Sequence, residues 1–250
     1  MAPLIIAHRG DSDRCPENTL ASFASALEVG ADLLEADVQL TKDGYVVVIH
    51  DPTLDRTTSG AGSVRAMTLA EVRGVSAGYP ARFGSGFGGE RVPTLAEVLG
   101  LLRGRGRLMI EIKGESVVAG EAADGIEART VAEVRKAGMA ADVVLISFDR
   151  RALVRCRRHA PEITRGHLFG AGEAPDEIVA GAQEVGSELV LPERRMLGDA
   201  LHAAVRGAGL RLATWVVDDP EELRALARFE LYGVATNRPG EMLDALWESE

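Results

Sequence analysis

The sequence predicts a closed (β/α)8 barrel, the TIM-barrel fold. Its 250 residues are a typical length for one such barrel, and hydrophobic residues make up 46% of them, enough for a large core. Short apolar segments typical of buried strands alternate with segments of helical periodicity along most of the chain. The alternative, a doubly wound open sheet, lacks the glycine-rich dinucleotide motif that would support it.

Eight parallel strands are expected, one from each apolar segment. They begin at Leu4, Leu33, Arg107, Val143, Thr164, Glu188, Arg211 and Tyr232. Helices are expected at Leu20 to Leu27, after Thr94, and near residues 121–137, 150–159, 176–185, 199–208, 220–229 and 240–248. The number eight requires that Tyr45 to His50 forms an additional antiparallel strand outside the barrel.

The residues from Leu33 to Asp51 are expected to form a hairpin. Lys42-Asp43-Gly44 carries the Asp-Gly signal of a tight turn, and Tyr45 to Ile49 is β-branched and aromatic. If Leu40 and Tyr45 flank the turn, the second barrel strand runs up to Leu40 and the additional strand returns from Tyr45.

This register brings acidic and imidazole side chains together, because it pairs Asp37 with Val48 and Glu35 with His50. Glu35 and Asp37 are two residues apart, so they project from one face of a strand whose apolar neighbours indicate burial. Buried carboxylates need a cation or strong donors. Salt bridges would satisfy one acid alone, but two acids facing a histidine favour a divalent metal.

Active sites of TIM barrels lie at the carboxyl ends of the strands. The side chains at those ends are His8-Arg9, Glu35 with Asp37, Glu111 with Lys113, Ser147-Phe148, His167, Glu193, Trp215 and Asn237. Glu35, Asp37 and Glu111 lie on neighbouring strands, and three converging carboxylates suit a hard cation such as Mg²⁺ or Ca²⁺. A local ion pair with Lys113 is the alternative reading of Glu111.

Three other strand-end residues receive weaker interpretations. His167 is expected to be structural, and Glu193 is expected in a solvated loop. Trp215 fits either the core or an aromatic wall of the pocket, and its position at a strand end favours the wall.

Residues 52–92 are predicted to be a small insertion over the barrel mouth, within a single domain that spans residues 1–250. Glycine- and serine-rich stretches at 57–63 and 84–89 are typical of loops, and Thr68 to Glu71 has the capping box of a short helix. A loop of this length is more often a lid or binding element than a plain connector.

The composition excludes several kinds of partner. The net charge of −10 argues against a general nucleic-acid binder, and the lack of an apolar run near 18 residues argues against stable membrane insertion. The start of the chain, residues 1–7, lacks the basic region of a signal peptide, so we expect a cytoplasmic protein whose oligomeric state is open.

Five short motifs follow one another along the chain. They are His8-Arg9-Gly10, Pro16-Glu17-Asn18-Thr19, Glu35-Ala36-Asp37, His50-Asp51 and Glu111-Ile112-Lys113. In this order they resemble the glycerophosphodiester phosphodiesterases, from the first strand to the last helix. The resemblance implies a barrel with a small insertion that hydrolyses glycerophosphodiesters to sn-glycerol 3-phosphate and an alcohol.

The resemblance also implies roles for the residues in these motifs. Glu35, Asp37 and Glu111 would hold one divalent metal ion, Mg²⁺ or Ca²⁺. His8 and His50 would form the acid–base pair, and we favour His8 as base and His50 as acid, with the mirror assignment open.

The substrate would be held by a second group of side chains. The resemblance implies that Arg9 and Lys113 bind the phosphate, and Phe148 and Trp215 are our further candidates for substrate contact.

The chain departs from the family in its last third. Thr214-Trp215-Val216-Val217-Asp218 stands where the family usually has Trp-Thr-Val-Asn, and Asn237 stands where the closing motif usually has Asp. These differences leave the metal and histidine positions unchanged and affect the pocket wall and the preference for the alcohol.

The chemistry of a phosphodiester accounts for these groups independently. A cation and basic side chains must neutralise the charge on phosphorus, while one group deprotonates the nucleophile and another protonates the leaving alkoxide. Two histidines suit this task near neutral pH. No Ser or Cys adjoins His8 or His50, so the nucleophile is water or the substrate's own hydroxyl, and the hydroxyl would give a cyclic phosphate.

Two other classes of function remain. A sphingomyelinase-D-like enzyme would need an exposed apolar rim, for which the insertion offers only Tyr79, Phe83 and Phe87. A binding barrel without catalysis should have lost a histidine or a ligand, and none is missing.

Overall fold

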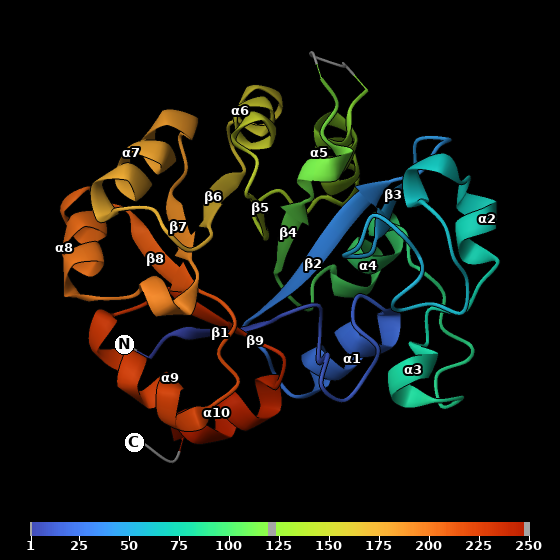
Figure 1. Cartoon of the computed structure of the whole chain (residues 1–250), viewed down its shortest axis with the longest axis horizontal. Helices are drawn as coiled ribbons and strands as arrows, with labels where there is room; N and C mark the ends of the chain where they lie inside the picture. The colour runs from blue at the N-terminus through green and yellow to red at the C-terminus, as the bar shows by residue number, and fades with distance from the viewer. Residues whose placement is uncertain (1, 120–123, 248–250) are drawn as a thin grey trace.

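In the computed structural model, which describes residues 2–119 and 124–247, eight parallel strands close into a barrel with helices around it (Figure 1). The strands are β1 (Leu4–Ala7), β2 (Leu33–Leu40), β4 (Leu108–Ile112), β5 (Val143–Ser147), β6 (Thr164–Phe169), β7 (Leu189–Pro192), β8 (Arg211–Thr214) and β9 (Gly233–Thr236). Because β1 pairs with both β2 and β9, the barrel closes between its first and last strands. The predicted fold is confirmed.

Each barrel strand is joined to the next by at least one helix. The main connecting helices are α1 (Leu20–Glu28), α4 (Leu95–Leu102), α5 (Ile126–Ala137), α6 (Arg150–His159), α7 (Pro175–Val185), α8 (Asp199–Gly207) and α9 (Pro220–Leu226), and α10 (Pro239–Trp247) follows the last strand. Thr94 caps α4 through the backbone of Glu97, and Gly138 ends α5 in a left-handed conformation. Two helices are predicted near residues 121–137 and 240–248, and their parts at 121–123 and 248 lie outside the described residues.

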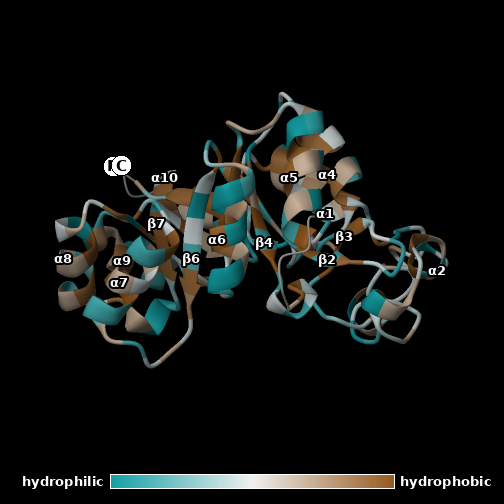
Figure 2. Cartoon of the chain, turned by 90° about the horizontal axis from the view of Figure 1, so that it is seen from above, coloured by the Kyte–Doolittle hydropathy of each residue, from teal (hydrophilic) through white to brown (hydrophobic). Residues whose placement is uncertain are grey.

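The barrel interior is filled by apolar side chains, with charged side chains above them. Along β2, Leu33 points inward with the interior cluster, whereas Leu34 packs outward against the helices. Alternation along a strand therefore places Glu35 and Asp37 on the inner face above Leu33. On β4, Glu111 follows inward-facing Met109 in the same way. In Figure 2 most strands carry hydrophobic colours, whereas β6 and the helices around the barrel include hydrophilic stretches.

The register predicted for the hairpin is wrong by one residue. The additional strand β3 (Val46–Val48) is antiparallel to β2, as expected, but Val48 pairs with Val38 and not with Asp37. Thr41 donates its backbone N–H to the carbonyl of Tyr45 at 3.0 Å, which closes a three-residue loop. Gly44 makes this loop possible because it adopts a φ of +84°, typical of the bulged hairpin turn.

The corrected register changes the partners of the acids. Ile49 donates its backbone N–H to the carbonyl of Asp37 at 3.0 Å, so Ile49 lies opposite Asp37. The expected pairing of Glu35 with His50 does not occur, and His50 lies beyond the end of β3.

Residues 52–92 contain a 3-10 turn (Val64–Ala66) and the short helices α2 (Leu69–Arg73) and α3 (Pro80–Phe83), at the right of Figure 1. The segment has an apolar cluster of its own, which also includes two side chains of the returning hairpin arm. The members are Val47, Ile49, Leu54, Val64, Val72, Ala77 and Val92. This small core fixes the insertion to β3 and leaves its polar residues near the mouth available for ion pairs.

None of the helices among the described residues is both long and apolar enough to cross a membrane.

Candidate active site

Three carboxylates converge at the carboxyl ends of β2 and β4. Asp37 and Glu111 are register partners on the two strands, and Glu35 lies one inward-facing position below Asp37. One oxygen atom of each of the three acids lies within 4.8 Å of the others. The side chains of Glu35 and Asp37 are buried, and that of Glu111 is 12% exposed. The predicted convergence of the three acids is therefore present in the structure.

Two basic side chains border the carboxylates. Arg9 follows β1, and its Nε lies 3.1 Å from Asp37 Oδ2, while its backbone N–H donates to Glu35 Oε2 at 3.0 Å. Lys113 follows β4, and its Nζ lies 2.7 Å from Glu111 Oε1 and 3.4 Å from Asp37 Oδ1. The ion pair between Glu111 and Lys113 thus coexists with the cluster of acids.

Asn18 holds Asp37 from a second side. Its amide nitrogen donates to Asp37 Oδ2 at 2.8 Å, and the backbone N–H of Asp37 donates to Asn18 Oδ1 at 3.2 Å. Asn18 is buried and has a φ of +58°, a left-handed conformation that asparagine adopts more readily than most residues. The predicted motif around Pro16 therefore orients a carboxylate of the cluster.

The protonation of the three acids is unusual. Burial, together with the charges of Asp37 and Glu111, raises the pKa of Glu35 well above its ordinary value. Burial and the charge of Asp37 raise the pKa of Glu111 to about 7. Burial also acts against the charged form of Asp37, but Arg9 and Lys113 hold the pKa of this acid below its usual range. Close packing thus drives two of the three acids towards the neutral form.

A divalent cation fits this arrangement. Glu35 Oε1 is buried and has no hydrogen-bond partner among the described residues, so one oxygen of the cluster has an unmet need for a positive group. A set of three carboxylates is the donor chemistry of Mg²⁺ or Ca²⁺.

The wider ion-pair network supports the same fit. In the part of the chain that is described, it joins the acids Glu17, Asp37, Asp51 and Glu111 to the bases Arg9, Arg56 and Lys113. Glu35 adjoins this network without an ion pair of its own. The carboxyl groups therefore outnumber the bases by two, and a divalent cation could replace the protons that Glu35 and Glu111 otherwise favour.

His8, at the end of β1, is held by the last strand of the barrel. Its Nδ1 lies 2.8 Å from the side-chain oxygen of Asn237, which follows β9. Burial lowers the pKa of His8 to about 4, and the neighbouring charge of Arg9 acts in the same direction. The imidazole is therefore neutral at neutral pH and can accept a proton.

His50 has a different environment. Its Nδ1 lies 2.6 Å from Asp51 Oδ1, and its backbone carbonyl accepts a hydrogen bond from Gln39 Nε2 at 3.0 Å. The positive charge of His50 also helps to hold the pKa of Asp37 low, which places the imidazole beside the cluster.

Arg56 ties these groups together from the insertion. Its guanidinium contacts Asp51 at 2.6 Å and both oxygens of Glu17 at 2.8 Å, and Glu17 in turn contacts Arg9 at 2.9 Å. Sequence reasoning missed Arg56, because one arginine in a loop has no signature and its partner Glu17 is 39 residues away.

The two aromatic candidates at strand ends lie against each other. Phe148 and Trp215 have ring centroids 5.6 Å apart in an edge-to-face arrangement. Trp215 also packs on the interior cluster and donates its indole N–H to the carbonyl of Leu191 at 2.9 Å. Phe148 is 45% exposed and is free to contact a ligand. Trp215 thus has features of both readings that the sequence left open.

The contacts of the remaining candidates, His167 and Glu193, are with residues other than the three acids. His167 is buried with its ring 4.1 Å from that of Phe169, in keeping with a structural residue. Glu193 is half-buried, not solvated as expected, because its carboxylate accepts the backbone N–H of Arg195 at 3.1 Å.

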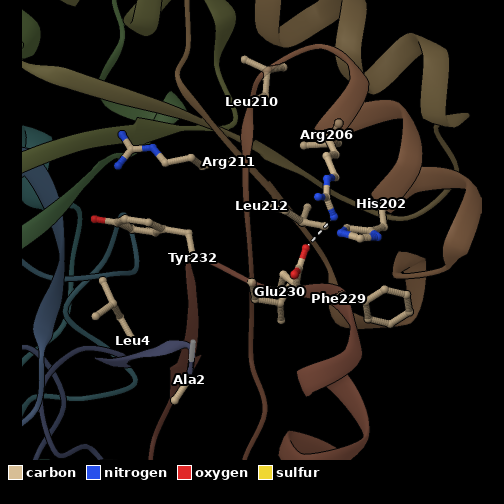
Figure 3. Close-up of a pocket in the computed structure, with 12 residues that line it drawn as sticks. Ala2, Leu4, His202, Arg206, Leu210, Arg211, Leu212, Phe229, Glu230 and Tyr232 are labelled. Atoms are coloured by element: carbon tan, nitrogen blue, oxygen red, sulfur yellow. Dashed lines mark hydrogen bonds and ion pairs between the residues drawn. The ribbon is translucent and has the colours of Figure 1, made fainter.

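A cavity of about 510 Å³ lies at the opposite end of the barrel. Residues near the amino ends of β1, β8 and β9 line it (Figure 3). Its charges are already paired, since Arg206 contacts Glu230 at 2.6 Å and Arg211 stacks on the ring of Tyr232 at 4.7 Å. Because barrel sites form at the carboxyl ends, the acid cluster is the better candidate.

Known proteins share both the sequence and the architecture. Residues 8–241 match the glycerophosphoryl diester phosphodiesterase family. A glycerophosphodiester phosphodiesterase of Caldanaerobacter subterraneus subsp. tengcongensis is 37% identical over 245 residues, which cover 98% of either chain.

Two solved structures extend the likeness to the fold. The glycerophosphodiester phosphodiesterase of Agrobacterium tumefaciens is 31% identical with a TM-score of 0.81, over 97% of this chain and 99% of that one. A phosphodiesterase of Oleispira antarctica, in complex with its product sn-glycerol-3-phosphate, is 27% identical with a TM-score of 0.87, over 98% and 97% of the two chains.

Proposed function

Because this chain belongs to the glycerophosphoryl diester phosphodiesterase family, we propose that it hydrolyses glycerophosphodiesters to sn-glycerol 3-phosphate and an alcohol with one divalent metal ion. The chain is an enzyme of the phosphoric diester hydrolase class. The observation that carries the metal is the convergence of three acid oxygens within 4.8 Å, one of them buried without a partner.

Glu35, Asp37 and Glu111 would hold the ion, Mg²⁺ or Ca²⁺. When bound, it would supply positive charge that stabilises the phosphoryl oxygens as negative charge develops on them. A cation among these carboxylates would also compete with Arg9 and Lys113 for the same oxygens. Both bases would then be available to the phosphate of the substrate.

The two histidines would transfer the protons. In the first step His8 takes the proton of the glycerol hydroxyl next to the ester, and its oxygen bonds to phosphorus. The bond from phosphorus to the alcohol oxygen breaks, and His50 gives that oxygen its proton. In the second step His50 takes a proton from water, which opens the cyclic phosphate, and His8 protonates the oxygen released. One diester and one water give one monoester and one alcohol.

The environments of the histidines favour this assignment over its mirror image. His50 has the carboxylate of Asp51 as its hydrogen-bond partner, an arrangement that suits the acid of the first step. His8 has the neutral Asn237 as its partner, which suits the base.

We also propose that the substrate is a small water-soluble diester. Among the described residues, the large hydrophobic side chains that stand exposed are Tyr45, Phe148 and Trp247. Of these, Phe148 follows a barrel strand at the end where the acids lie, and one exposed ring is not a surface for intact lipid. Phe148 and Trp215 would contact the alcohol, and the insertion at residues 52–92 would limit access to the mouth.

A headgroup panel tests the function. We expect glycerol 3-phosphate release that stops in excess chelator and returns with Mg²⁺ or Ca²⁺. Glu111→Gln should lose at least about 100-fold in kcat, whereas Glu115→Gln, the same change at an exposed site four residues on, should not. Full activity of the metal-stripped protein would refute the requirement for a metal ion. Failure to release glycerol 3-phosphate from any diester would refute the proposed function.

A deoxy substrate tests the nucleophile. A diester that lacks the hydroxyl next to the ester should be a very poor substrate, because intramolecular attack avoids fixing a water molecule. The protein should also hydrolyse the cyclic glycerol phosphate. Equal kcat/KM for the deoxy and natural diesters would instead make water the direct nucleophile.

A further inference from the structure

We infer that Asp218 and Asn237 are positioning residues that fix which ring nitrogen of His8 carries the proton. The inference rests on the proton transfer proposed above for His8. It starts from a chain of hydrogen bonds that runs from the loop after β8, through the end of β9, to the imidazole at the end of β1.

The carboxylate of Asp218 is the fixed end of this chain. It accepts the side-chain amide of Asn237 at 2.7 Å, the backbone N–H of Asn237 at 2.7 Å and the hydroxyl of Thr236 at 2.8 Å. An ionised carboxylate only accepts hydrogen bonds. The amide nitrogen of Asn237 must therefore face Asp218, although an isolated amide could take either orientation.

The orientation of Asn237 determines the proton on His8. With its nitrogen facing Asp218, Asn237 presents its oxygen to His8 Nδ1 at 2.8 Å and to the hydroxyl of Ser12 at 3.0 Å. An acceptor at this point requires a proton on Nδ1 of His8. In the neutral ring Nε2 is then the atom with the free lone pair, as a general base requires.

Asp218 and Asn237 thus act as one unit beside His8. Their side chains are in direct contact at 2.7 Å, so the negative charge of the carboxylate lies one residue away from the imidazole while the amide fixes the direction of the hydrogen bonds.

Removing the carboxylate should reverse that direction. In Asp218→Asn the new side-chain oxygen still accepts the backbone N–H of Asn237, so its amide nitrogen faces the Asn237 side chain. Asn237 then turns its oxygen to position 218 and its nitrogen to His8, which places the His8 proton on Nε2. We expect kcat to fall by about 10²–10⁴-fold, the contribution of a lost general base, with little change in KM.

The reciprocal variant provides the rescue. Asn237→Asp alone puts two carboxylates face to face and should also reduce kcat. Asp218→Asn combined with Asn237→Asp restores one amide donor and one carboxylate acceptor, so kcat should return to within a few-fold of the wild type. Asp219→Asn is the matched control, because it removes a charge at the next residue while asparagine still caps α9.

Nitrogen-15 NMR of the imidazoles reads the proton position without turnover. The His8 signal, identified by its loss in His8→Gln, should report Nδ1–H in the wild type and the double variant, and Nε2–H in Asp218→Asn. Nε2–H in the wild type would overturn the inference, even if a single variant does not fold. An Asp218→Asn enzyme with Nδ1–H and wild-type kcat would do so as well. Absence of diesterase activity would refute the proposed function and leave the NMR result to decide the positioning.

Discussion

Asn18 offers the sharpest test of how the acid cluster is built. Its side chain satisfies both the carboxylate and the backbone N–H of Asp37, and its own backbone is left-handed. Asn18→Gly removes the side chain and tolerates the backbone, whereas Asn18→Ala keeps a Cβ in the left-handed region, which alanine tolerates less well than asparagine or glycine. The pair of variants thus separates the side-chain effect from the backbone effect.

The magnitudes follow from the contacts that each variant loses. In Asn18→Gly the buried N–H of Asp37 loses its acceptor, which costs about 1–3 kcal/mol of unfolding free energy. Asp37 Oδ2 keeps Arg9 at 3.1 Å, so its loss is smaller. Asn18→Ala should cost about 1–2 kcal/mol more for the left-handed backbone. Both variants should weaken metal binding by about 10–100-fold, because Asp37 is no longer oriented.

Urea unfolding of the metal-free proteins measures the stability, and titration calorimetry with Mg²⁺ or Ca²⁺ measures the affinity. Unchanged metal affinity in both variants would refute the role of Asn18 in orienting Asp37. Equal stability of the alanine and glycine variants would refute the cost assigned to the backbone. Circular dichroism of each variant confirms that the barrel is retained.

Three further predictions concern stability. Burial lowers the pKa of His167 to about 4, so between pH 6.5 and 4 the unfolded chain binds a proton that the folded chain does not. On acidification over this range the wild type should therefore lose up to about 3 kcal/mol more unfolding free energy than His167→Gln, as measured by urea titration. Parallel pH profiles of the two proteins would contradict this. Gly10→Ala should cost about 2–4 kcal/mol of unfolding free energy, because φ is +81° and a Cβ would lie 2.6 Å from the carbonyl carbon of Ser22. A loss below about 1 kcal/mol would contradict the close packing at this position. Leu54→Ala should speed hydrogen exchange across residues 52–92 and leave the barrel strands protected, whereas faster exchange throughout would couple the insertion to the barrel.

The fold could be predicted because its signals are local. Strand and helix periods, capping residues such as Thr94 and terminating glycines such as Gly138 each act within a few residues. The acid cluster could be predicted for a related reason. Glu35 and Asp37 share a face by their spacing alone, and the barrel order places Glu111 on the next strand.

The errors and omissions arose where the outcome depends on contacts across the chain. The hairpin register depends on the backbone conformation of Gly44, and a three-residue and a four-residue loop give the same Asp-Gly signal. Arg56 meets Glu17 only after the insertion has folded onto the mouth. Asp218 contacts Asn237 although the two residues are 19 apart, and nothing in the sequence around either one indicates the contact.

The layering of β2 has a consequence for how this protein can evolve. Glu35 lies directly above Leu33 in the barrel interior, and one of its oxygens has no partner among the described residues. A buried acid of this kind destabilises the fold, and a well-packed apolar replacement is often neutral or stabilising. Glu35→Met removes this cost but leaves the backbone N–H of Arg9 without its acceptor, so the melting temperature of the metal-free protein should change little while a ligand is lost. The stability of the barrel thus gains little from an acid at this depth, and its presence in the core is a record of selection for chemistry.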